Sequence, residues 1–235
     1  MKQAIYLPGG VNQFNHLKTN TELKGKSVLI VGATTEIIGK LFLEAGAASV
    51  AIILDDYDLL TNTRLAIKGT EKISIKFMEY FNTDFGDETF DIVFAQGSIS
   101  NTERNKILKE VKRILNQQGI ACTGEYTAIK TNPPKYVKDV WESGNIVPLH
   151  SDDLVTYYQA RNFDVAEVLE LSSKLKEFYA TSKKLLNEKI DYLTEQEKIY
   201  YKKLLKRISH ESNVYLNLGG SDYMGFSSII LRKFQ

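Results

Sequence analysis

The sequence predicts an α/β fold built on a mostly parallel β-sheet with helices on both faces. Over residues 27–129, short apolar runs rich in branched residues alternate with segments of helical periodicity. Strict alternation of strand and helix is the pattern of a parallel sheet covered by helices on both sides. After residue 129 this rhythm stops, and a long charged helical segment precedes the last apolar run.

The first half of the chain defines the sheet. Residues 27–32, "SVLIVG", form a continuous apolar run, as expected of a strand buried on both faces. The next segment has apolar residues at helical spacing from Ile37 to Ala45, and Gly46 is expected to end this helix. Further strands are predicted over 49–56, 72–80, 89–97 and 119–129.

An amphipathic helix is predicted over residues 100–119, before the last of these strands. Ser100 and Glu103 have the spacing of a capping box, which satisfies free backbone N–H groups at a helix start. Gly119 is expected to end this helix, because glycine accepts the left-handed conformation common after a last turn.

The second half of the chain is less regular. Residues 130–162 contain three of the four prolines and the single tryptophan, so an irregular lid or a short broken helix is expected there. Within it, 151–162 should be helical, with Ser151 or Asp152 as the N-cap. A strand at 163–171, a helical insertion at 172–213 and a final strand at 223–233 complete the chain.

The insertion is predicted to contain two helices. Thr194 and Glu197 stand in capping-box register and should start the second helix. Its lysines are interleaved with acids, and its apolar residues keep helical spacing, so a solvated amphipathic face over a substrate pocket is favoured over a nucleic-acid surface.

Composition limits the classes of function. The 235 residues suit a single domain, 1–235, and the net charge of +1 gives no general attraction to nucleic acid or membranes. Only one cysteine is present and no Cys/His cluster suggests a metal site. The start lacks a signal-peptide core, and no apolar run of membrane-spanning length occurs. A soluble, cytoplasmic protein is expected.

Several blocks resemble the class I S-adenosylmethionine (SAM) methyltransferases. "FDIVFAQGSIS" is similar to that family's fourth-strand block, "LKEVKRILNQQGIACTGEY" to the helix and strand that follow, and "DFGDETFDIV" to the loop before them. With the turn at Gly32, they cover residues 25–130 in the family's order. The resemblance implies a Rossmann-like, doubly wound, mostly parallel seven-stranded sheet with a C-terminal antiparallel strand and a helical insertion before it. It also implies SAM as cofactor and a small-molecule acceptor.

The turn "VGATTE" departs from the family. The family has acid-x-Gly-x-Gly-x-Gly, whereas this chain keeps Gly32, follows it with Ala33, and has Thr34 and Glu36 at the later glycine positions. Three interpretations are open. SAM binds with altered contacts, with Glu36 pairing with its ammonium group and the helix N-terminus attracting its carboxylate. Alternatively, the site is degenerate, or it serves another cofactor.

Other cofactor contacts are expected where strands end. An acid after the second strand can accept hydrogen bonds from a ribose diol, and Asp55 and Asp56 both stand there. The resemblance places Glu79 near the adenine amino group, Tyr80 beside the ring and Gln96 beside the reaction centre.

Substrate contacts are expected from the lid and from aromatic side chains. His150, next to the lid, is the candidate general base. Aromatic faces suit sulfonium and methylated ammonium groups, and Arg161 could hold a carboxylate. The candidate substrate-binding residues are Tyr6, Tyr126, Trp141, Tyr157 and Arg161.

Two alternatives of other classes remain. Tyr179 and Lys183 match the Tyr-x-x-x-Lys pair of short-chain dehydrogenases, which would make the protein an NAD(P) oxidoreductase. A methyltransferase-like protein without catalysis, acting as a partner of another protein, would explain the lost glycines. Binding of SAM would indicate the methyltransferase, binding of NAD(P) the dehydrogenase, and binding of neither the non-catalytic protein.

Overall fold

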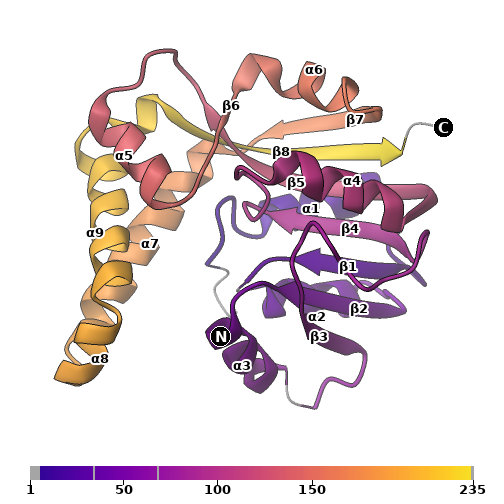
Figure 1. The fold of residues 1–235 in the computed structure, drawn as a ribbon, viewed down its shortest axis with the longest axis horizontal. Coiled ribbons are helices and arrows are strands. Elements are labelled where there is room, and N and C mark those ends of the chain that lie inside the picture. The colour runs from indigo at the N-terminus through magenta and orange to yellow at the C-terminus, as the bar shows by residue number, and fades with distance from the viewer. Residues whose placement is uncertain (1–5, 34, 68, 234–235) are drawn as a thin grey trace.

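The computed structural model describes residues 6–33, 35–67 and 69–233, and it is organised around one twisted sheet (Figure 1). The strands lie in the order β3-β2-β1-β4-β5-β8-β7, and a short β6 pairs with the end of β5. Their bounds are β1 Ser27–Val31, β2 Ser49–Leu54, β3 Ile73–Phe77, β4 Phe90–Gln96, β5 Leu115–Ala128, β6 Leu149–His150, β7 Phe163–Glu170 and β8 Met224–Lys233.

The pairing confirms the predicted fold class. β1 pairs in parallel with both β2 and β4, and β4 pairs in parallel with β5. Only β8 runs the other way, and it is antiparallel to both of its neighbours, β5 and β7. The sheet is therefore Rossmann-like and mostly parallel, with the C-terminal strand reversed.

Helices cover both faces of the sheet, as predicted. One face packs against α1 (Asn12–Asn20), α2 (Glu36–Glu44) and α3 (Tyr57–Ala66), in a core that includes Phe14, Phe42 and Phe94. The other face packs against α4 (Arg104–Ile114) and α6 (Leu154–Gln159). Helix α1 was not predicted from the sequence, and its buried face includes the polar residues Gln13 and His16.

The insertion between β7 and β8 is a helical hairpin beside the sheet (Figure 1). Since β7 is parallel in direction to β5, and β8 opposes both, β7 ends and β8 begins at the edge where β1, β2 and β4 end. The hairpin therefore rises from the carboxyl edge of the sheet. Its helices, with α5 packed beside them, are α7 Ser172–Ile190, α8 Glu195–Tyr200, α9 Lys202–Asn217 and α5 Lys135–Ser143.

The predicted start and end of the helix at 100–119 are wrong. α4 begins at Arg104 after Glu103, which makes no side-chain cap, because the Ser100 hydroxyl donates instead to Glu125. The helix ends at Ile114, and Gly119 lies inside β5. A long-range hydrogen bond thus replaces the local cap that the spacing predicts.

In the second half of the chain, one of the two predicted caps differs from the structure and the other is confirmed. The N-cap of the 3₁₀ turn Ser151–Asp153 is His150, rather than Ser151 or Asp152, and α6 starts only at Leu154. The capping box of Thr194 and Glu197 is confirmed at the start of α8. The insertion contains three helices rather than two, because a break after α8 separates it from α9.

Gly124, in the middle of β5, is where α1 approaches the sheet most closely. A Cβ atom built on Gly124 would lie 2.1 Å from Gln13 Oε1 and 2.5 Å from Phe226 Cζ. The amide nitrogen of Gln13 donates to Ala95 O at 2.9 Å and to Cys122 O at 3.3 Å. The missing side chain at 124 thus allows α1 to insert an amide between two strands.

We expect Gly124→Ala to destabilise the protein by about 2–4 kcal/mol, through overpacking and loss of the Gln13 hydrogen bonds. Urea denaturation followed by circular dichroism measures this. Gly86→Ala is the matched control, because a Cβ there would meet only Thr89 Oγ1 at 3.6 Å. Its effect should stay within about 0.5 kcal/mol. Equal stability of both variants would contradict the close packing at Gly124.

Candidate active site

The turn after β1 is shaped by a close approach to the end of β4. Gly32 has φ 118°, and a Cβ there would lie 2.7 Å from Ser98 Cβ. The Ser98 hydroxyl donates to Val31 O at 2.6 Å, which ties the two strand ends together. Glycine is thus required at position 32 for both conformation and space.

The residues after Gly32 form the start of α2. The Thr35 hydroxyl donates to Gly32 O at 2.8 Å and is buried, so it stabilises the turn itself. Glu36 is the first residue of α2, and its Oε2 atom is buried without a hydrogen-bond partner among the described residues. Ala33 is half-buried, and Thr34 lies outside the described residues.

Asp55 and Asp56 directly follow β2 and are exposed at the same edge. Asp56 Oδ1 accepts a hydrogen bond from Leu59 N at 3.1 Å, so one oxygen of this carboxylate is bound to the backbone at the start of α3. Asp55 lies beside Tyr80: burial first, and then the Asp55 charge, raise the pKa of the Tyr80 hydroxyl. The structure therefore brings these two predicted cofactor residues together.

Two further predicted cofactor residues differ in their surroundings. Glu79 is exposed two residues beyond the end of β3 and forms an isolated bridge with Asn82. Gln96 is buried, and its amide nitrogen donates to Pro8 O at 2.7 Å and Gly10 O at 2.8 Å. Gln96 thus anchors the N-terminal segment against the end of β4.

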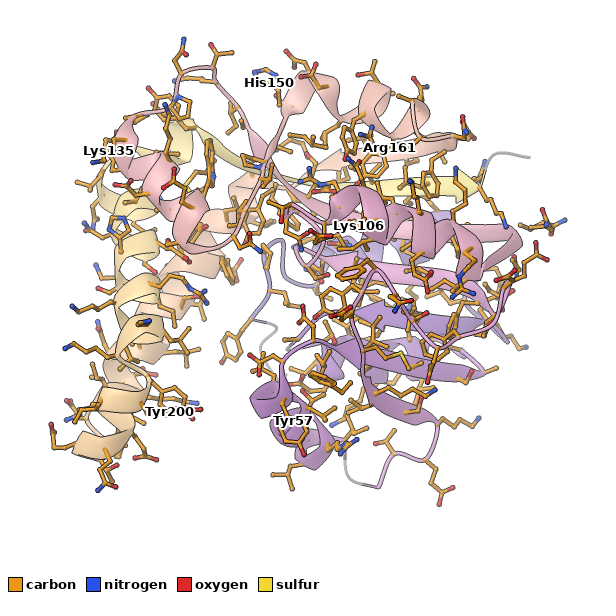
Figure 2. All side chains as sticks on the ribbon, viewed as in Figure 1. Tyr57, Lys106, Lys135, His150, Arg161 and Tyr200 are labelled. Atoms are coloured by element: carbon orange, nitrogen blue, oxygen red, sulfur yellow. The ribbon has the colours of Figure 1, made fainter. Side chains whose placement is uncertain are left out.

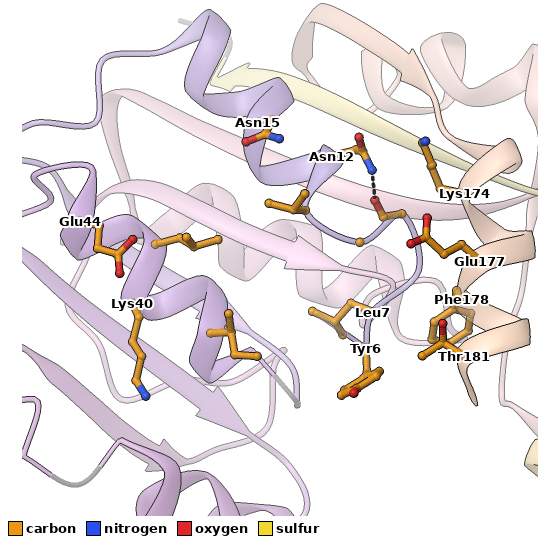
Figure 3. A pocket seen from close by; sticks show the side chains of 15 residues that line it. Tyr6, Leu7, Asn12, Asn15, Lys40, Glu44, Lys174, Glu177, Phe178 and Thr181 are labelled. Atoms are coloured by element: carbon orange, nitrogen blue, oxygen red, sulfur yellow. Dashed lines mark hydrogen bonds between the residues drawn. The ribbon is translucent and has the colours of Figure 1, made fainter. Parts of the chain in front are cut away.

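That N-terminal segment lines a cleft of about 690 Å³ between α2 and α7 (Figure 3). The cleft reaches Ile37, one residue after Glu36, and Tyr6 lies at its mouth with 42% of its surface exposed. Asn12 Nδ2 donates to Gly9 O at 3.0 Å and holds the bend of the segment. Of the predicted substrate residues, Tyr6 is the one that lines this cleft.

The predicted residues Tyr126 and Trp141 both contact the apolar core beneath the hairpin. Tyr126, near the end of β5, packs edge-on against Phe226 with ring centroids 5.4 Å apart, and its ring meets the position of a Cβ on Gly97. Trp141 is buried in the core beneath α5, α7 and α9, beside residues such as Val140. Trp141 thus packs the hairpin, and Tyr126 joins the same core to the end of β4.

Three predicted residues, Tyr157, Arg161 and His150, lie on or next to α6, and Figure 2 labels His150 and Arg161 there. Tyr157 and Arg161 both bind Asn105 on α4, and the Arg161 guanidinium stacks 3.4 Å from the Tyr157 ring centroid. Lys112, in the last turn of α4, donates to Arg161 O, which places this end of α6 toward the amino edge of the sheet. His150 Nδ1 accepts from Asp152 N at 3.4 Å and caps the turn that follows it.

One buried ionic cluster was not predicted from the sequence. Glu125 is fully buried on β5 and lies 3.2 Å from the guanidinium of Arg104, which is itself 4% exposed. Its carboxylate also accepts hydrogen bonds from Ser100, at 2.5 Å, and from Tyr158. The same arginine nitrogen, Nη2, also donates to Val147 O in the segment predicted to form a lid. The cluster therefore joins α4, β5, α6 and the lid, and nothing local in the sequence marks it.

A second unpredicted acid stands on the hairpin. Glu211 on α9 has a side chain 18% exposed, and burial raises its pKa to about 7. Arg207 Nε lies 3.5 Å from Glu211 Oε1 and opposes this shift. The Glu211 charge in turn contributes to the raised pKa values of Tyr126 and Tyr179.

The described residues hold no group of three or more His, Cys, Asp or Glu side chains placed to bind a metal ion. Within the same residues, the helices are too short or too polar to span a bilayer.

A family of sequences and several solved structures are similar to this chain. Residues 29–123 match the family described as "Methyltransferase domain". No curated protein matches the sequence. Among solved structures, a putative sarcosine dimethylglycine methyltransferase from Galdieria sulphuraria is similar with a TM-score of 0.76 at 10% identity, covering 94% of this chain and 84% of that one.

Two further structures share the fold. Phosphoethanolamine N-methyltransferase 2 from Haemonchus contortus, solved with S-adenosylhomocysteine (SAH), gives a TM-score of 0.76 at 16% identity over 97% of this chain and 54% of that one. The [4+2]-cyclase SpnF also gives 0.76 at 16% identity, over 94% and 79% of the two chains.

The matched family and the fold together confirm the resemblance to class I SAM-dependent methyltransferases. The matched residues 29–123 include most of β1, all of β2 and β4, and the turn at Gly32. The dehydrogenase alternative finds no support: Tyr179 is buried in the hairpin and stacked on Tyr215, with ring centroids 4.6 Å apart.

Loss of the Glu125 carboxylate should strongly destabilise the fold. We expect Glu125→Ala to cost about 3–5 kcal/mol, because it leaves the buried Arg104 charge without its partner. Asp84→Ala, which removes the exposed ion pair with Lys76, is the control and should cost less than about 1 kcal/mol. Chemical denaturation measures both, and a small cost for Glu125→Ala would show that solvent reaches Arg104.

Glu211 should make stability depend on pH. Its pKa is raised to about 7 in the folded protein, so it stabilises the fold at low pH, and this contribution is lost as pH rises through 7. We expect the melting temperature of Glu211→Gln, relative to the natural protein, to rise by several degrees between pH 5 and pH 8. A constant difference between the two would contradict the raised pKa.

Proposed function

We propose that this protein transfers the methyl group of SAM to a small-molecule acceptor. The fold by itself does not decide the reaction, since a [4+2]-cyclase has a similar structure. The observation that carries the proposal is the buried, unpartnered Oε2 atom of Glu36 at the first turn of α2. An unsatisfied buried carboxylate oxygen is costly unless a ligand donates to it.

The residues at the carboxyl edge fit the groups of SAM. Glu36 offers an acceptor to the ammonium of the methionine moiety, and the N-terminus of α2 offers backbone N–H groups to its carboxylate. Asp55, exposed after β2, offers an acceptor to the ribose diol, and the Tyr80 side chain beside it offers a surface to the base. Glu79 and Gln96 border the same edge.

SAM supplies a methyl group activated on a positive sulfonium. The protein's task is then to align the acceptor with that methyl group and to exclude water. In this proposal, 1–235 act as a single domain, in which the lid at 130–162 and the insertion at 172–213 cover the edge. Tyr6 and Tyr126 contact the acceptor, while Trp141, Tyr157, Arg161 and His150 are left out, because their partners lie elsewhere.

We also propose that the protein acts in the cytoplasm. Its single cysteine, Cys122, is free and buried, which suits a reducing compartment.

Parallel calorimetric titrations with SAM, SAH and NADPH test the function. Binding of both sulfur ligands, followed by methyl transfer to a small-molecule acceptor, is the expected result. Binding of NADPH alone would favour a dehydrogenase. A folded protein that binds none of the three would be a non-catalytic relative.

Glu36→Gln should weaken SAM binding by about 1–3 kcal/mol, because it replaces a charge-assisted hydrogen bond to the ammonium with a neutral contact. Asp55→Ala should weaken SAM binding by a similar amount through the lost ribose contact. Glu22→Gln, an exposed acid ahead of the start of β1 and so at the opposite edge of the sheet, is the control and should bind SAM as the natural protein does. Titration calorimetry measures all three, and unchanged affinity would remove the substituted residue from the site.

A further inference from the structure

The cleft between α2 and α7 has walls of apolar side chains that come from three parts of the chain (Figure 3). The N-terminal segment contributes Leu7 and Val11, α2 contributes Ile37 and Leu41, and α7 contributes Phe178. Leu7 is buried, whereas the side chains from α2 and α7 are half-buried and so still offer surface to a ligand. The interior of the cleft therefore suits an apolar molecule.

Charged side chains lie at the rim of this cleft. They are two lysines and two glutamates, Lys40, Glu44, Lys174 and Glu177, so their formal charges cancel. The two glutamates are exposed, and the two lysines are half-buried. Lys40 Nζ donates to Ala66 O at 3.0 Å, in the last residue of α3, so this ammonium group is already bound to a backbone carbonyl. The net charge that the cleft presents to a ligand is therefore close to zero.

The polar groups of the cleft give a charged ligand no buried partner. Asn12 uses its amide nitrogen to hold Gly9 O at 3.0 Å, and Asn15 is exposed. Of the residues that line the cleft, all of which the structure describes, only Leu7 and Gly9 are buried. A charged ligand would lose water on entering without gaining a buried counter-charge, which is costly. An uncharged apolar ligand has no such cost.

The cleft reaches two places where the proposed methyl transfer is expected. At one, Ile37 follows Glu36, whose Oε2 atom is buried without a partner among the described residues. At the other, Gly10 lines the cleft, and its carbonyl accepts at 2.8 Å from the amide nitrogen of Gln96, the last residue of β4. The cleft volume, about 690 Å³, lies within the range of about 300–1,000 Å³ that holds a drug-sized ligand. A molecule of that size can therefore extend from the first turn of α2 along this helix.

We propose that this cleft binds the acceptor and that the acceptor is an uncharged molecule with an extended apolar body. The body packs between α2 and α7, and the nucleophilic atom lies at the Ile37 end of the cleft. In the transfer, a lone pair of this atom forms a bond to the methyl carbon, the C–S bond breaks with its electron pair on sulfur, and the proton of the acceptor leaves to water. This inference rests on the proposed function and names its class of acceptor.

The test uses the full chain saturated with SAH and three probes that share a 1-naphthylamine body. At neutral pH, N-phenyl-1-naphthylamine is uncharged, 8-anilinonaphthalene-1-sulfonate is an anion, and N-(1-naphthyl)ethylenediamine is a cation. Binding is followed by the naphthyl fluorescence, excited at a wavelength that tryptophan does not absorb.

Two variants fill the cleft from opposite walls. Val11→Trp does so from the N-terminal segment, and Thr181→Trp does so from α7. Val155→Trp on α6 is the matched control, because Val155 is 39% exposed, against 37% for Val11, and does not line the cleft. Circular dichroism and SAH binding show whether each variant is folded.

We expect the uncharged probe to bind at least tenfold more tightly than either charged probe. Val11→Trp and Thr181→Trp should each weaken its binding at least tenfold and leave SAH binding unchanged, whereas Val155→Trp should bind it as the natural protein does. With SAM in place of SAH, an inter-ligand nuclear Overhauser effect should connect the SAM methyl protons with the naphthyl protons, because the acceptor and the methyl group lie side by side.

Failure to bind SAH would overturn the proposed function itself. With SAH bound, the acceptor inference is overturned if a charged probe binds as tightly as the uncharged one, or if the uncharged probe binds both cleft variants as it binds the natural protein. Absence of the Overhauser effect for a probe that Val11→Trp excludes would also overturn it, because the cleft would then hold apolar molecules away from the methyl group.

Discussion

The close approach of Gly32 to Ser98 is the constraint on which the rest of the site depends. With 2.7 Å between Ser98 Cβ and the place where a Cβ on residue 32 would be, any other residue would separate β1 from β4. Their adjacency places the first turn of α2 beside the end of β4. From there Gln96 holds the N-terminal segment by two backbone carbonyls. The absence of a side chain at position 32 thus sets where the turn after β1, the end of β4 and the N-terminal segment meet.

Local patterns predicted the strands and failed where side chains reach across the fold. Continuous apolar runs predicted β1, β2, β4 and β8, because a strand that is buried on both faces is apolar along its whole length. The spacing of Ser100 and Glu103 suggested a cap, yet Ser100 donates to Glu125, 25 residues away. α1 was not predicted because its buried face includes Gln13 and His16, and His16 Nδ1 lies 2.8 Å from Ser228 Oγ. Such polar contacts between distant segments leave no periodic signal.

The sequence predicted the surroundings of some candidate site residues better than those of others, for a related reason. Position after a parallel strand predicted that Asp55 lies at the carboxyl edge, and the structure has it there beside Tyr80. Residue type is a poor guide, since aromatic side chains fill cores as readily as they bind cations. Both Trp141 and Tyr126 pack in the core beneath the hairpin, and Tyr126 also lies close to Gly97 at the end of β4. Glu211 was not predicted because in the sequence it resembles the other acids of a charged helix, and only its burial in the folded hairpin distinguishes it.

The hairpin leaves and re-enters the sheet at neighbouring points. Leu171 N donates to Phe226 O at 2.8 Å, so the chain departs for α7 beside the strand by which it returns. A segment whose two ends already touch can change in length or content at little entropic cost to the remainder. New acceptor specificities can therefore arise by exchange of this one segment, while the cofactor half of the molecule is inherited without alteration.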